Sequence, residues 1–298
     1  MATPVEVDVF DRNESITLLR RRASQLTARE AGRVAEALGD LPLALAQAGA
    51  HLADTGTSAN DYFTLLAKRI TDLLAQSAPA TYPVSLAASV QVALDRLTAQ
   101  SPAALQLLTL AAYLAPEPIP LTLFTSHPIQ LPDPLATAAA DPLAFAGLTR
   151  LLRQLGLARV ESGTLQLHRL LAAILRAQHH QQQDLPILAV RLLRVVAPTD
   201  PWDNPPVWPI WHQLLPHVLV VTDHHRPLDG AEEEVAWLLD RAATYLQARG
   251  EYASARPLFE RALDLRRSWL GPDHPGTLAS ANSLALDLWS LGRYEQAR

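Results

Sequence analysis

Cysteine is absent from the 298-residue chain, and lysine occurs once, at Lys68. Without thiols the chain can form no disulfides and no thiolate metal sites, which favours the reducing cytosol as its compartment. The phosphate-binding loop G-x-x-x-x-G-K-[ST] requires a lysine followed by serine or threonine. Because Lys68 is followed by Arg69 and has no glycine nearby, we expect no nucleotide-hydrolysis site of this type in the chain.

Long apolar runs and strong charge are also missing. No stretch of about 18 residues is apolar and uncharged, and no basic-then-apolar leader follows Met1. The net charge of −5 is mild, whereas a dedicated nucleic-acid binder normally carries a basic field. Neither a G-x-S-x-G motif nor a cysteine nucleophile is present. These absences predict a cytoplasmic chain that is not an enzyme and contacts neither a membrane nor nucleic acid.

Alanine and leucine dominate the composition, hydrophobic residues make up 49% of it, and β-branched residues are sparse. Alanine and leucine lead the scale of helix propensity, so a mainly α fold is expected. The length is sufficient for two or three domains. We predict a helical domain at 1–76, a winged-helix domain at 77–180, a Pro/Trp-rich helical connector at 181–230, and helical repeats at 231–298.

Capping signals mark the helices of the first domain. The alternating segment VEVDVF at 5–10 is typical of a short strand, and either Asp11 or Asn13 can cap the helix that follows it. Thr27 and Glu30 have the spacing of a capping box. Pro42 is suited to the first turn of a helix. Helices are therefore expected over 14–22, 27–38, 41–56 and 60–75.

The second domain follows the linker QSAPATYP and contains the clearest β signal in the chain. Residues 157–160 and 164–167 flank the turn ESG, in which Gly163 can adopt a positive φ angle. A helix should begin directly afterwards, in HRLLAAILRAQ. Three preceding helices are expected near 86–97, 102–114 and 142–155. Three helices, a hairpin and a further helix form the pattern of a winged-helix domain.

The connector is rich in proline and tryptophan. Prolines are spread from Pro198 to Pro216, so this segment cannot form one continuous helix. Its three tryptophans are Trp202, Trp208 and Trp211. Since large aromatic side chains are usually well buried, we expect them to wedge between domains.

The last part of the chain begins to repeat itself. ARGEYASAR at 248–256 recurs as LGRYEQAR at 291–298, with Gly250 matching Gly292 and Tyr252 matching Tyr294 at an offset of 42 residues. Small and large apolar residues recur at helical spacing around each glycine, which resembles the tetratricopeptide repeat (TPR). The matching positions are Leu239, Ala242, Ala243, Leu246, Tyr252, Ala255, Phe259 and Ala262, then Ala281, Leu284, Ala285, Leu288, Tyr294 and Ala297.

The length and completeness of the repeats carry further expectations. The usual TPR period is about 34 residues, and the additional residues lie in RRSWLGPDHPGT, which resembles the repeats of kinesin light chains. The second copy stops at Arg298, while a repeat buries its apolar face only against neighbours. We therefore expect the chain to be part of a longer protein, with further repeats after it and another domain before it.

The order of these segments resembles the C-terminal half of bacterial STAND-class signalling ATPases of the NB-ARC kind that carry TPRs. GDLPLALAQAGAHL is similar to the family's glycine–proline–leucine–alanine motif through Gly39 and Pro42. LQLHRLLAAILR is similar to its M-H-D motif, with His168 at the histidine and Arg169 in place of the acid. SPAALQLLTLAAYLAPEPIPLTLF resembles the start of its winged helix, and WPIWHQLLPHVLVVTDH resembles the connector before its repeats.

The resemblance implies roles for two residues. In the family the motif proline lies against adenine and the histidine reaches the β-phosphate of ADP, which holds a closed, inactive state until ATP replaces it. Pro42 and His168 would inherit these nucleotide-binding roles. Since the phosphate loop is absent here, ADP or ATP would bind the full-length parent, and no cofactor is expected on this chain alone. By residue type, Pro42 also suits a helix start and His168 a capping role.

The remaining histidines do not predict a metal site. His179 and His180 are adjacent, as are His224 and His225, so their side chains would diverge on a helix. No Asp, Glu or Cys pattern completes a tetrahedral set. Solvated surface histidines are the expectation.

We therefore expect the regulatory and sensor part of an ADP/ATP-controlled signalling switch. Its first two domains would close over a nucleotide held by an upstream P-loop domain, and its repeats would bind a protein or peptide. A free-standing TPR adaptor and part of a bacterial transcriptional regulator are the alternatives. DNA contact by the winged helix is not expected, because its helix at 142–155 carries only Arg150 and Arg153 as cations.

Overall fold

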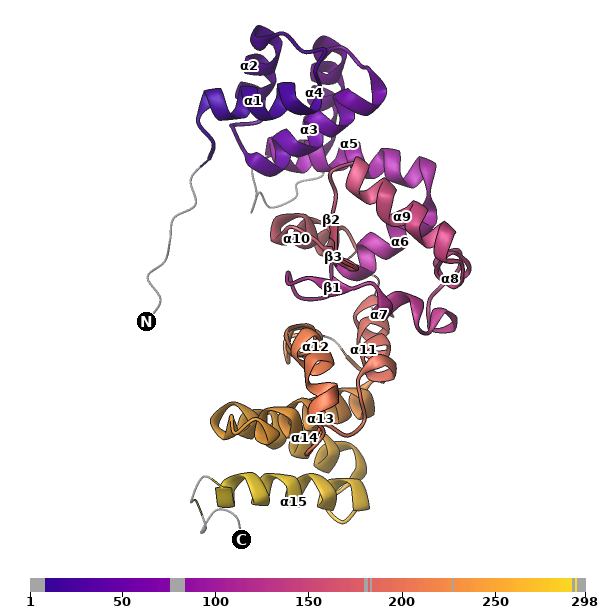
Figure 1. Ribbon diagram of the computed structural model, residues 1–298, viewed down its shortest axis with the longest axis vertical. Helices are drawn as coiled ribbons and strands as arrows, with labels where there is room; N and C mark the ends of the chain where they lie inside the picture. Colours follow the sequence, from indigo (N-terminus) through magenta and orange to yellow (C-terminus); the bar gives the residue numbers. More distant parts are fainter. Residues whose placement is uncertain are drawn as a thin grey trace. The chain divides into compact units, whose positions relative to one another are not determined.

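Figure 1 shows the computed structural model as a ribbon, in which the described residues are 9–75, 84–179, 182, 184–226, 228–290 and 293. Regular structure within them is mostly helical, with one small three-stranded sheet. The predicted mainly α fold is confirmed. The strand predicted at 5–10 and the linker predicted at 76–83 lie largely outside the described residues, and Val9 and Phe10 belong to no strand.

The chain divides into two compact units. Apart from the residues that the structure does not describe, the first unit comprises Met1–Leu108, Leu143–Val160 and Leu167–Ile174, and the second comprises Thr109–Pro142, Glu161–Gln166 and Leu175–Arg298. The domain boundaries predicted near 76, 180 and 230 are a different division of the chain and stay predictions.

Most of the first unit is built from helices. They are α1 (Arg12–Arg22), α2 (Ala28–Ala37), α3 (Pro42–Thr55), α4 (Ala59–Ala75), α5 (Val84–Gln100), most of α6 (Pro102–Ala111), most of α9 (Pro142–Gln154) and the start of α10 (Arg169–Gln178). Each predicted helix of this region is present within a few residues of its expected ends.

Side-chain caps begin the first two helices: of the two candidates for α1 the cap is Asp11, and the capping box predicted at Thr27 is present. Asp11 accepts hydrogen bonds from the backbone N–H groups of Asn13 and Glu14, each at 2.8 Å, and Glu14 accepts one from the Asp11 N–H. Thr27 and Glu30 form the same reciprocal pair at the start of α2. Such caps satisfy N–H groups that have no partner inside the helix.

Helix α3 is the central element of the first unit. It contacts α1 and α5, and most of its side chains after Leu43 are buried. Gly156 approaches it so closely that a Cβ atom there would lie 3.3 Å from the Ala46 carbonyl oxygen. The start of α3 and the turn that precedes the hairpin are thereby held together by backbone contact.

The second unit contains the remaining elements. They are the ends of α6 and α10, β1 (Ile119–Pro120), α7 (Thr122–Thr125), the 3-10 helices η1 (Pro128–Gln130) and η2 (Pro205–Val207), α8 (Leu135–Ala140), β3 (Thr164–Gln166), α11 (Asp184–Val196), α12 (Trp208–Val221), α13 (Glu232–Ala248), α14 (Tyr252–Leu270) and α15 (Pro275–Ser290). Strand β2 (Arg159–Glu161) lies at the division between the units.

The predicted hairpin is present, and a third strand extends it. The strand order is β1-β3-β2, with Ile119 opposite Leu165 in an antiparallel pair. The hairpin turn has positive φ angles at Ser162 (48°) and Gly163 (76°), as a tight turn requires. Strand β1 was not predicted from the sequence because only two residues pair, too few to produce an alternating pattern.

The connector contains one buried tryptophan and one exposed tryptophan. Trp211, on α12, is fully buried and stacks on Tyr245 of α13 with their ring centroids 6.1 Å apart. Trp202 is 54% exposed. Trp208 is half-buried. The expected burial is therefore confirmed for Trp211 and wrong for Trp202, whereas a position between domains stays a prediction. Helix α12 starts only at Trp208, and Pro216 lies inside it.

A buried histidine joins α12 to the segment that leads into β1. His217 has no exposed surface; its Nδ1 accepts a hydrogen bond from the Ala115 N–H at 3.2 Å, and its Nε2 lies 3.4 Å from the Pro118 carbonyl oxygen. Burial lowers the pKa of His217. A neutral ring with its proton on Nε2 satisfies both contacts, so this histidine has a structural role.

Candidate protein-interaction site

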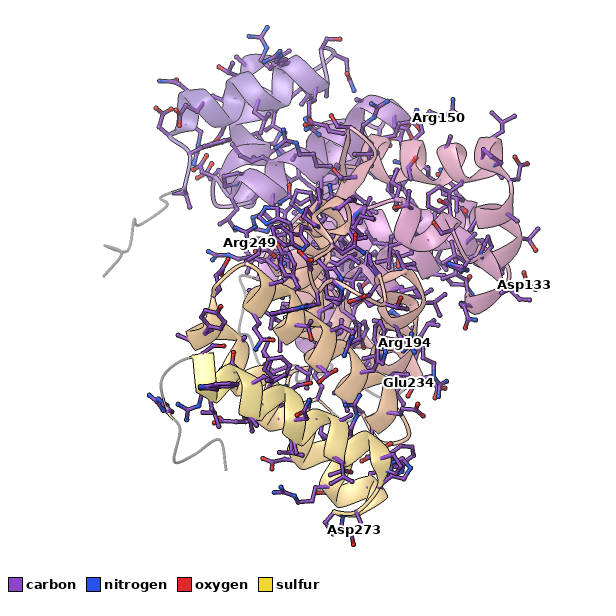
Figure 2. All side chains as sticks on the ribbon, turned by 60° about the horizontal axis from the view of Figure 1, so that its bottom comes forward. Asp133, Arg150, Arg194, Glu234, Arg249 and Asp273 are labelled. Atoms are coloured by element: carbon purple, nitrogen blue, oxygen red, sulfur yellow. The ribbon has the colours of Figure 1, made fainter. Side chains whose placement is uncertain are left out.

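The C-terminal helices form an array of neighbouring helices. Helix α13 packs along α14, and α14 in turn packs along α15 (Figure 1). Gly250 connects α13 to α14 with a φ angle of 79°, a conformation that favours glycine. The second connection, between α14 and α15, passes through Gly271 and Asp273, which is labelled in Figure 2. The array thus comprises both helices of the first repeat, α13 and α14, and the helix α15 that precedes the second recurring segment.

The apolar faces predicted for the first repeat are its buried faces. Phe259 of α14 is fully buried, as are the predicted alanines of α13 and α14. Small residues permit close helix approach and large ones fill the remaining space. The buried members of this set are Leu239, Ala242, Ala243, Leu246, Ala255, Phe259 and Ala262.

The second repeat is only partly covered. In α15, Leu288 is buried, whereas Ala281, Leu284 and Ala285 are half-buried. The matching positions Gly292, Tyr294 and Ala297 lie outside the described residues.

A polar cluster links three consecutive helices of the array. Asp240 of α13 is 3% exposed and pairs with Arg241 at 2.6 Å. Arg266 of α14 lies 3.9 Å from the other oxygen of Asp240 and also donates a hydrogen bond to the Ser280 hydroxyl of α15. Arg241 in addition donates to the Thr199 carbonyl oxygen. These contacts hold the first helices of the two repeats at a defined spacing.

Apolar side chains are exposed on α14 and α15. On α15, Trp289 is 61% exposed, and Leu278 and Leu286 are each about half exposed. Trp269, on α14, is exposed to a similar degree. Exposed apolar side chains on neighbouring helices are candidates for contact with another protein or a further chain segment.

A second buried carboxylate lies between α15 and α14. Asp287 has no exposed surface, and neither carboxylate oxygen has a hydrogen-bond partner among the described residues. Burial raises the pKa of Asp287 to about 6, with Arg256 opposing the shift and Glu260 adding to it. No sequence pattern marks this residue, because its burial depends on how α14 and α15 pack.

The two residues assigned to nucleotide binding both lie in the first unit. Pro42 is the first residue of α3 and half-buried. His168 is exposed and immediately precedes α10, where its Nδ1 accepts a hydrogen bond from the Leu170 N–H at 3.2 Å. Desolvation, followed by the positive charge of Arg169, lowers the pKa of His168. A helix-start role for Pro42 and a capping role for His168 are both present, and the nucleotide roles stay predictions.

The remaining candidates are distributed over the surface. Arg150, labelled in Figure 2, and Arg153 are both exposed on α9. His224 and His225 follow the end of α12 and lie in a turn. The expectation that their side chains diverge on a helix is therefore wrong, because no helix includes them.

Comparison with known proteins places the array in a family. Residues 234–298 match the tetratricopeptide repeat family. No curated protein matches the chain. In the parts of the chain that the structure describes, every helix is too short or too polar to span a lipid bilayer. The prediction of TPRs is confirmed for the C-terminal segment, whereas the resemblance of residues 1–233 to NB-ARC ATPases stays a prediction.

Proposed function

We propose that this protein binds a partner protein or peptide through its C-terminal helical array. The observation that carries the proposal is the packing of α13, α14 and α15 over the segment that matches the TPR family. TPRs generally mediate protein–protein interactions. The exposed apolar residues of α15 provide the kind of surface on which a partner can bury area.

The finer proposal is that the first unit makes this binding dependent on a nucleotide. ADP would be held mainly by an upstream P-loop domain, with Pro42 against the adenine and the Nε2 of His168 directed to the β-phosphate. Two observations support this arrangement: both residues belong to one compact unit, and α3 contacts the turn at Gly156 that precedes the hairpin. His168 is compatible with the role because its capping bond uses Nδ1 and its ring is exposed.

In this proposal the nucleotide and the partner bias one equilibrium between closed and open states. A ligand can shift such an equilibrium only by the difference in its affinity for the two states. ADP bound to the first unit would favour the closed state, and a partner bound to the array would favour the open one. The chain itself performs no catalytic step in this scheme.

A nucleotide titration of a chain extended upstream to include the P-loop domain tests the finer proposal. We expect His168→Ala to weaken ADP binding by roughly tenfold, which corresponds to the loss of one hydrogen bond to a charged group. Arg153→Ala, an exposed change on α9, is the control and should leave ADP binding unchanged. Equal affinity of the wild type and His168→Ala would remove this histidine from the nucleotide site.

The alternative is an adaptor that binds its partner without nucleotide control. The TPR match alone supports it equally well. The gene sequence upstream of Met1 separates the two proposals, because a G-x-x-x-x-G-K-[ST] motif there would support the switch and a stop codon would support the adaptor.

Partner binding itself is tested with peptides selected from a displayed library against the whole chain. Selected peptides should lose affinity for a Trp289→Ser, Leu286→Ser variant, because both side chains are exposed on α15. Leu143→Ser, which changes an exposed leucine on α9, should leave binding unchanged. Peptides that bind both variants as tightly as the wild type would show that the array is not the binding surface.

A further inference from the structure

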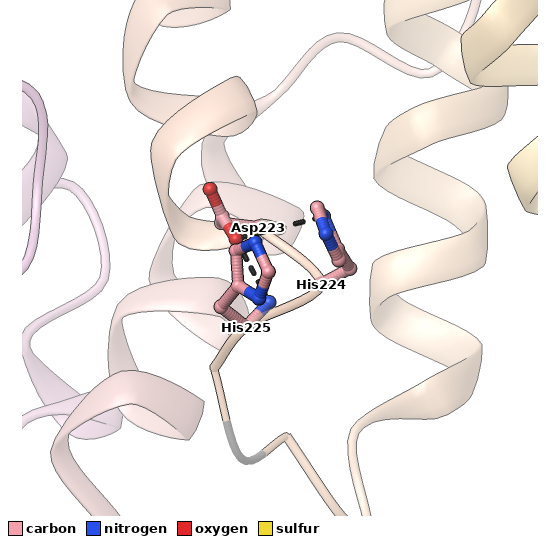
Figure 3. Close-up of side chains that lie close together, drawn as sticks. All are labelled: Asp223, His224 and His225. Atoms are coloured by element: carbon pink, nitrogen blue, oxygen red, sulfur yellow. Dashed lines mark hydrogen bonds and ion pairs between the residues drawn. The ribbon is translucent and has the colours of Figure 1, made fainter.

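The turn between α12 and α13 brings together a carboxylate and two imidazoles. Asp223, His224 and His225 each offer one ligand atom, and these three atoms lie within 4.8 Å of one another (Figure 3). The imidazole ring centroids of the two histidines are 3.7 Å apart. Three consecutive residues achieve this because they lie in a turn, where neighbouring side chains can point to the same side.

Hydrogen bonds hold the turn in this conformation. The Asp223 side chain accepts a hydrogen bond from the His225 N–H at 2.8 Å, and the Arg226 N–H donates to the Asp223 carbonyl oxygen at 3.1 Å. Thr222, the residue before the turn, is fully buried, and its hydroxyl donates a hydrogen bond to the Val218 carbonyl oxygen. The backbone that carries the three side chains is therefore anchored, while the His224 side chain is 70% exposed and the rings can rotate.

The second anchor is Arg226. Its guanidinium donates a hydrogen bond to the Tyr113 carbonyl oxygen at 2.9 Å and lies 5.8 Å from the centre of the Tyr113 ring. Arg226 remains close enough for its positive charge to act on Asp223. Arg261 of α14 is a further positive group whose field reaches Asp223. Both positive charges act on Asp223 and oppose the binding of a cation there, whereas His224 and His225 are exposed.

We propose that Asp223, His224 and His225 bind one divalent transition-metal ion of the zinc type. Two imidazole nitrogens and one carboxylate oxygen are ligands that Zn²⁺, Ni²⁺ and Cu²⁺ accept, whereas Mg²⁺ and Ca²⁺ prefer oxygen alone. Ligand atoms around tetrahedral zinc are roughly 3.4 Å apart, given bonds of about 2.0–2.2 Å. Rotation of the exposed rings closes the difference from the observed spacing, and water completes the coordination.

A metal ion here would stiffen the connection that leads into the repeat array. The three ligands lie between the end of α12 and the start of α13, and α12 packs against α13 through Trp211 and Tyr245. Binding would restrict the turn and stabilise this packing by mass action. This inference does not depend on the proposed nucleotide site or on a bound partner.

Calorimetric titration of Zn²⁺ into the metal-free chain tests the proposal. We expect one stoichiometric site in the wild type, with the association constant reduced at least about tenfold in His224→Ala and in His225→Ala, since each removes one ligand. Asp223→Asn keeps an oxygen that can accept the turn hydrogen bond and should also weaken binding. The controls are His127→Ala and His212→Ala, which remove single exposed histidines elsewhere.

Two results would overturn the proposal. One is equal Zn²⁺ affinity in the wild type and the His224→Ala, His225→Ala double variant. The other is an equal loss of affinity in the control variants, which would indicate diffuse binding by surface histidines. Co²⁺ provides a second readout, because its visible absorption reports the nitrogen and oxygen ligands directly and should disappear in the double variant. Unchanged circular dichroism of each variant would show that the fold is intact.

Discussion

Asp287 is expected to destabilise the packing of α15 on α14 at neutral pH. Its side chain is fully buried and neither oxygen has a hydrogen-bond partner among the described residues. A buried charge without partners is costly. The matching position of the first repeat, 42 residues earlier, is Tyr245, whose ring stacks on Trp211. An apolar side chain therefore suits this position, and Asp287→Leu should stabilise the array.

The pKa of Asp287 sets the size and the pH range of the effect. The shift from 3.8 to about 6 corresponds to about 3 kcal/mol, at about 1.4 kcal/mol per unit. Because the folded-state pKa lies above the unfolded value, the folded state binds the proton more tightly. The penalty is absent below pH 3.8, grows as the pH rises to about 6, and is complete above that value.

Hydrogen–deuterium exchange of the α15 amides measures this penalty locally. We expect Asp287→Leu to slow their exchange by up to about 100-fold at pH 7.5, corrected for intrinsic rates, and by much less at pH 4. Asp273→Leu, in the exposed loop before α15, is the matched control and should change little. Unchanged or faster exchange in Asp287→Leu at pH 7.5, or an effect independent of pH, would refute the assignment of a buried, charged carboxylate.

Three further predictions concern a cap, a buried ring and two glycines. His168→Ala should destabilise the start of α10 by about 0.5–2 kcal/mol, which faster exchange of its amide protons would show, and His168→Asn should restore the cap. Unchanged exchange in His168→Ala would argue against a capping role. Trp211→Ala should lower the free energy of unfolding of the second unit by about 3–5 kcal/mol, measured by chemical denaturation, whereas Trp202→Ala should change it little because that side chain is exposed. Equal losses of stability in the two variants would contradict the burial of Trp211. Gly250→Ala should lower the free energy of unfolding by about 1 kcal/mol, because the φ angle of Gly250 is 79°. Gly147→Ala should raise it by about 0.5–1 kcal/mol, because Gly147 lies inside α9 and a Cβ atom there would meet open space. Thermal unfolding measures both changes, and midpoints that shift in the same direction would refute the reasoning.

Local signals in the sequence predicted most of the helices. The N-cap at Asp11, the capping box at Thr27 and the proline start at Pro42 all depend on residues within one turn of each other. Such contacts form whatever the rest of the chain does, so short sequence patterns can identify them. The hairpin at Gly163 follows the same logic, since its turn requires a positive φ angle.

The helical array that forms the candidate interaction site could be predicted because its sequence pattern recurs along the chain. The recurrence of Gly250 and Tyr252 at 42 residues, with small and large residues at helical spacing, is enough to indicate a TPR-type array. The match of residues 234–298 to that family agrees. The assignment of Pro42 and His168 to a nucleotide site depends on resemblance alone. In the structure Pro42 begins α3 and His168 caps α10, and these positions are explained equally well without a nucleotide.

By itself, the amino-acid sequence determined where most of the helices begin and end, since these features depend on neighbouring residues, and it determined which segments repeat. Only the tertiary structure decided that Trp211 is buried while Trp202 is exposed, that Ile119 pairs with Leu165 to add a strand, and that Asp287 loses all contact with water. It also decided that His224 and His225 share a turn with Asp223. The physical reason is that burial, strand pairing and side-chain convergence depend on residues distant in the chain or on the backbone conformation of a loop, which no local pattern encodes.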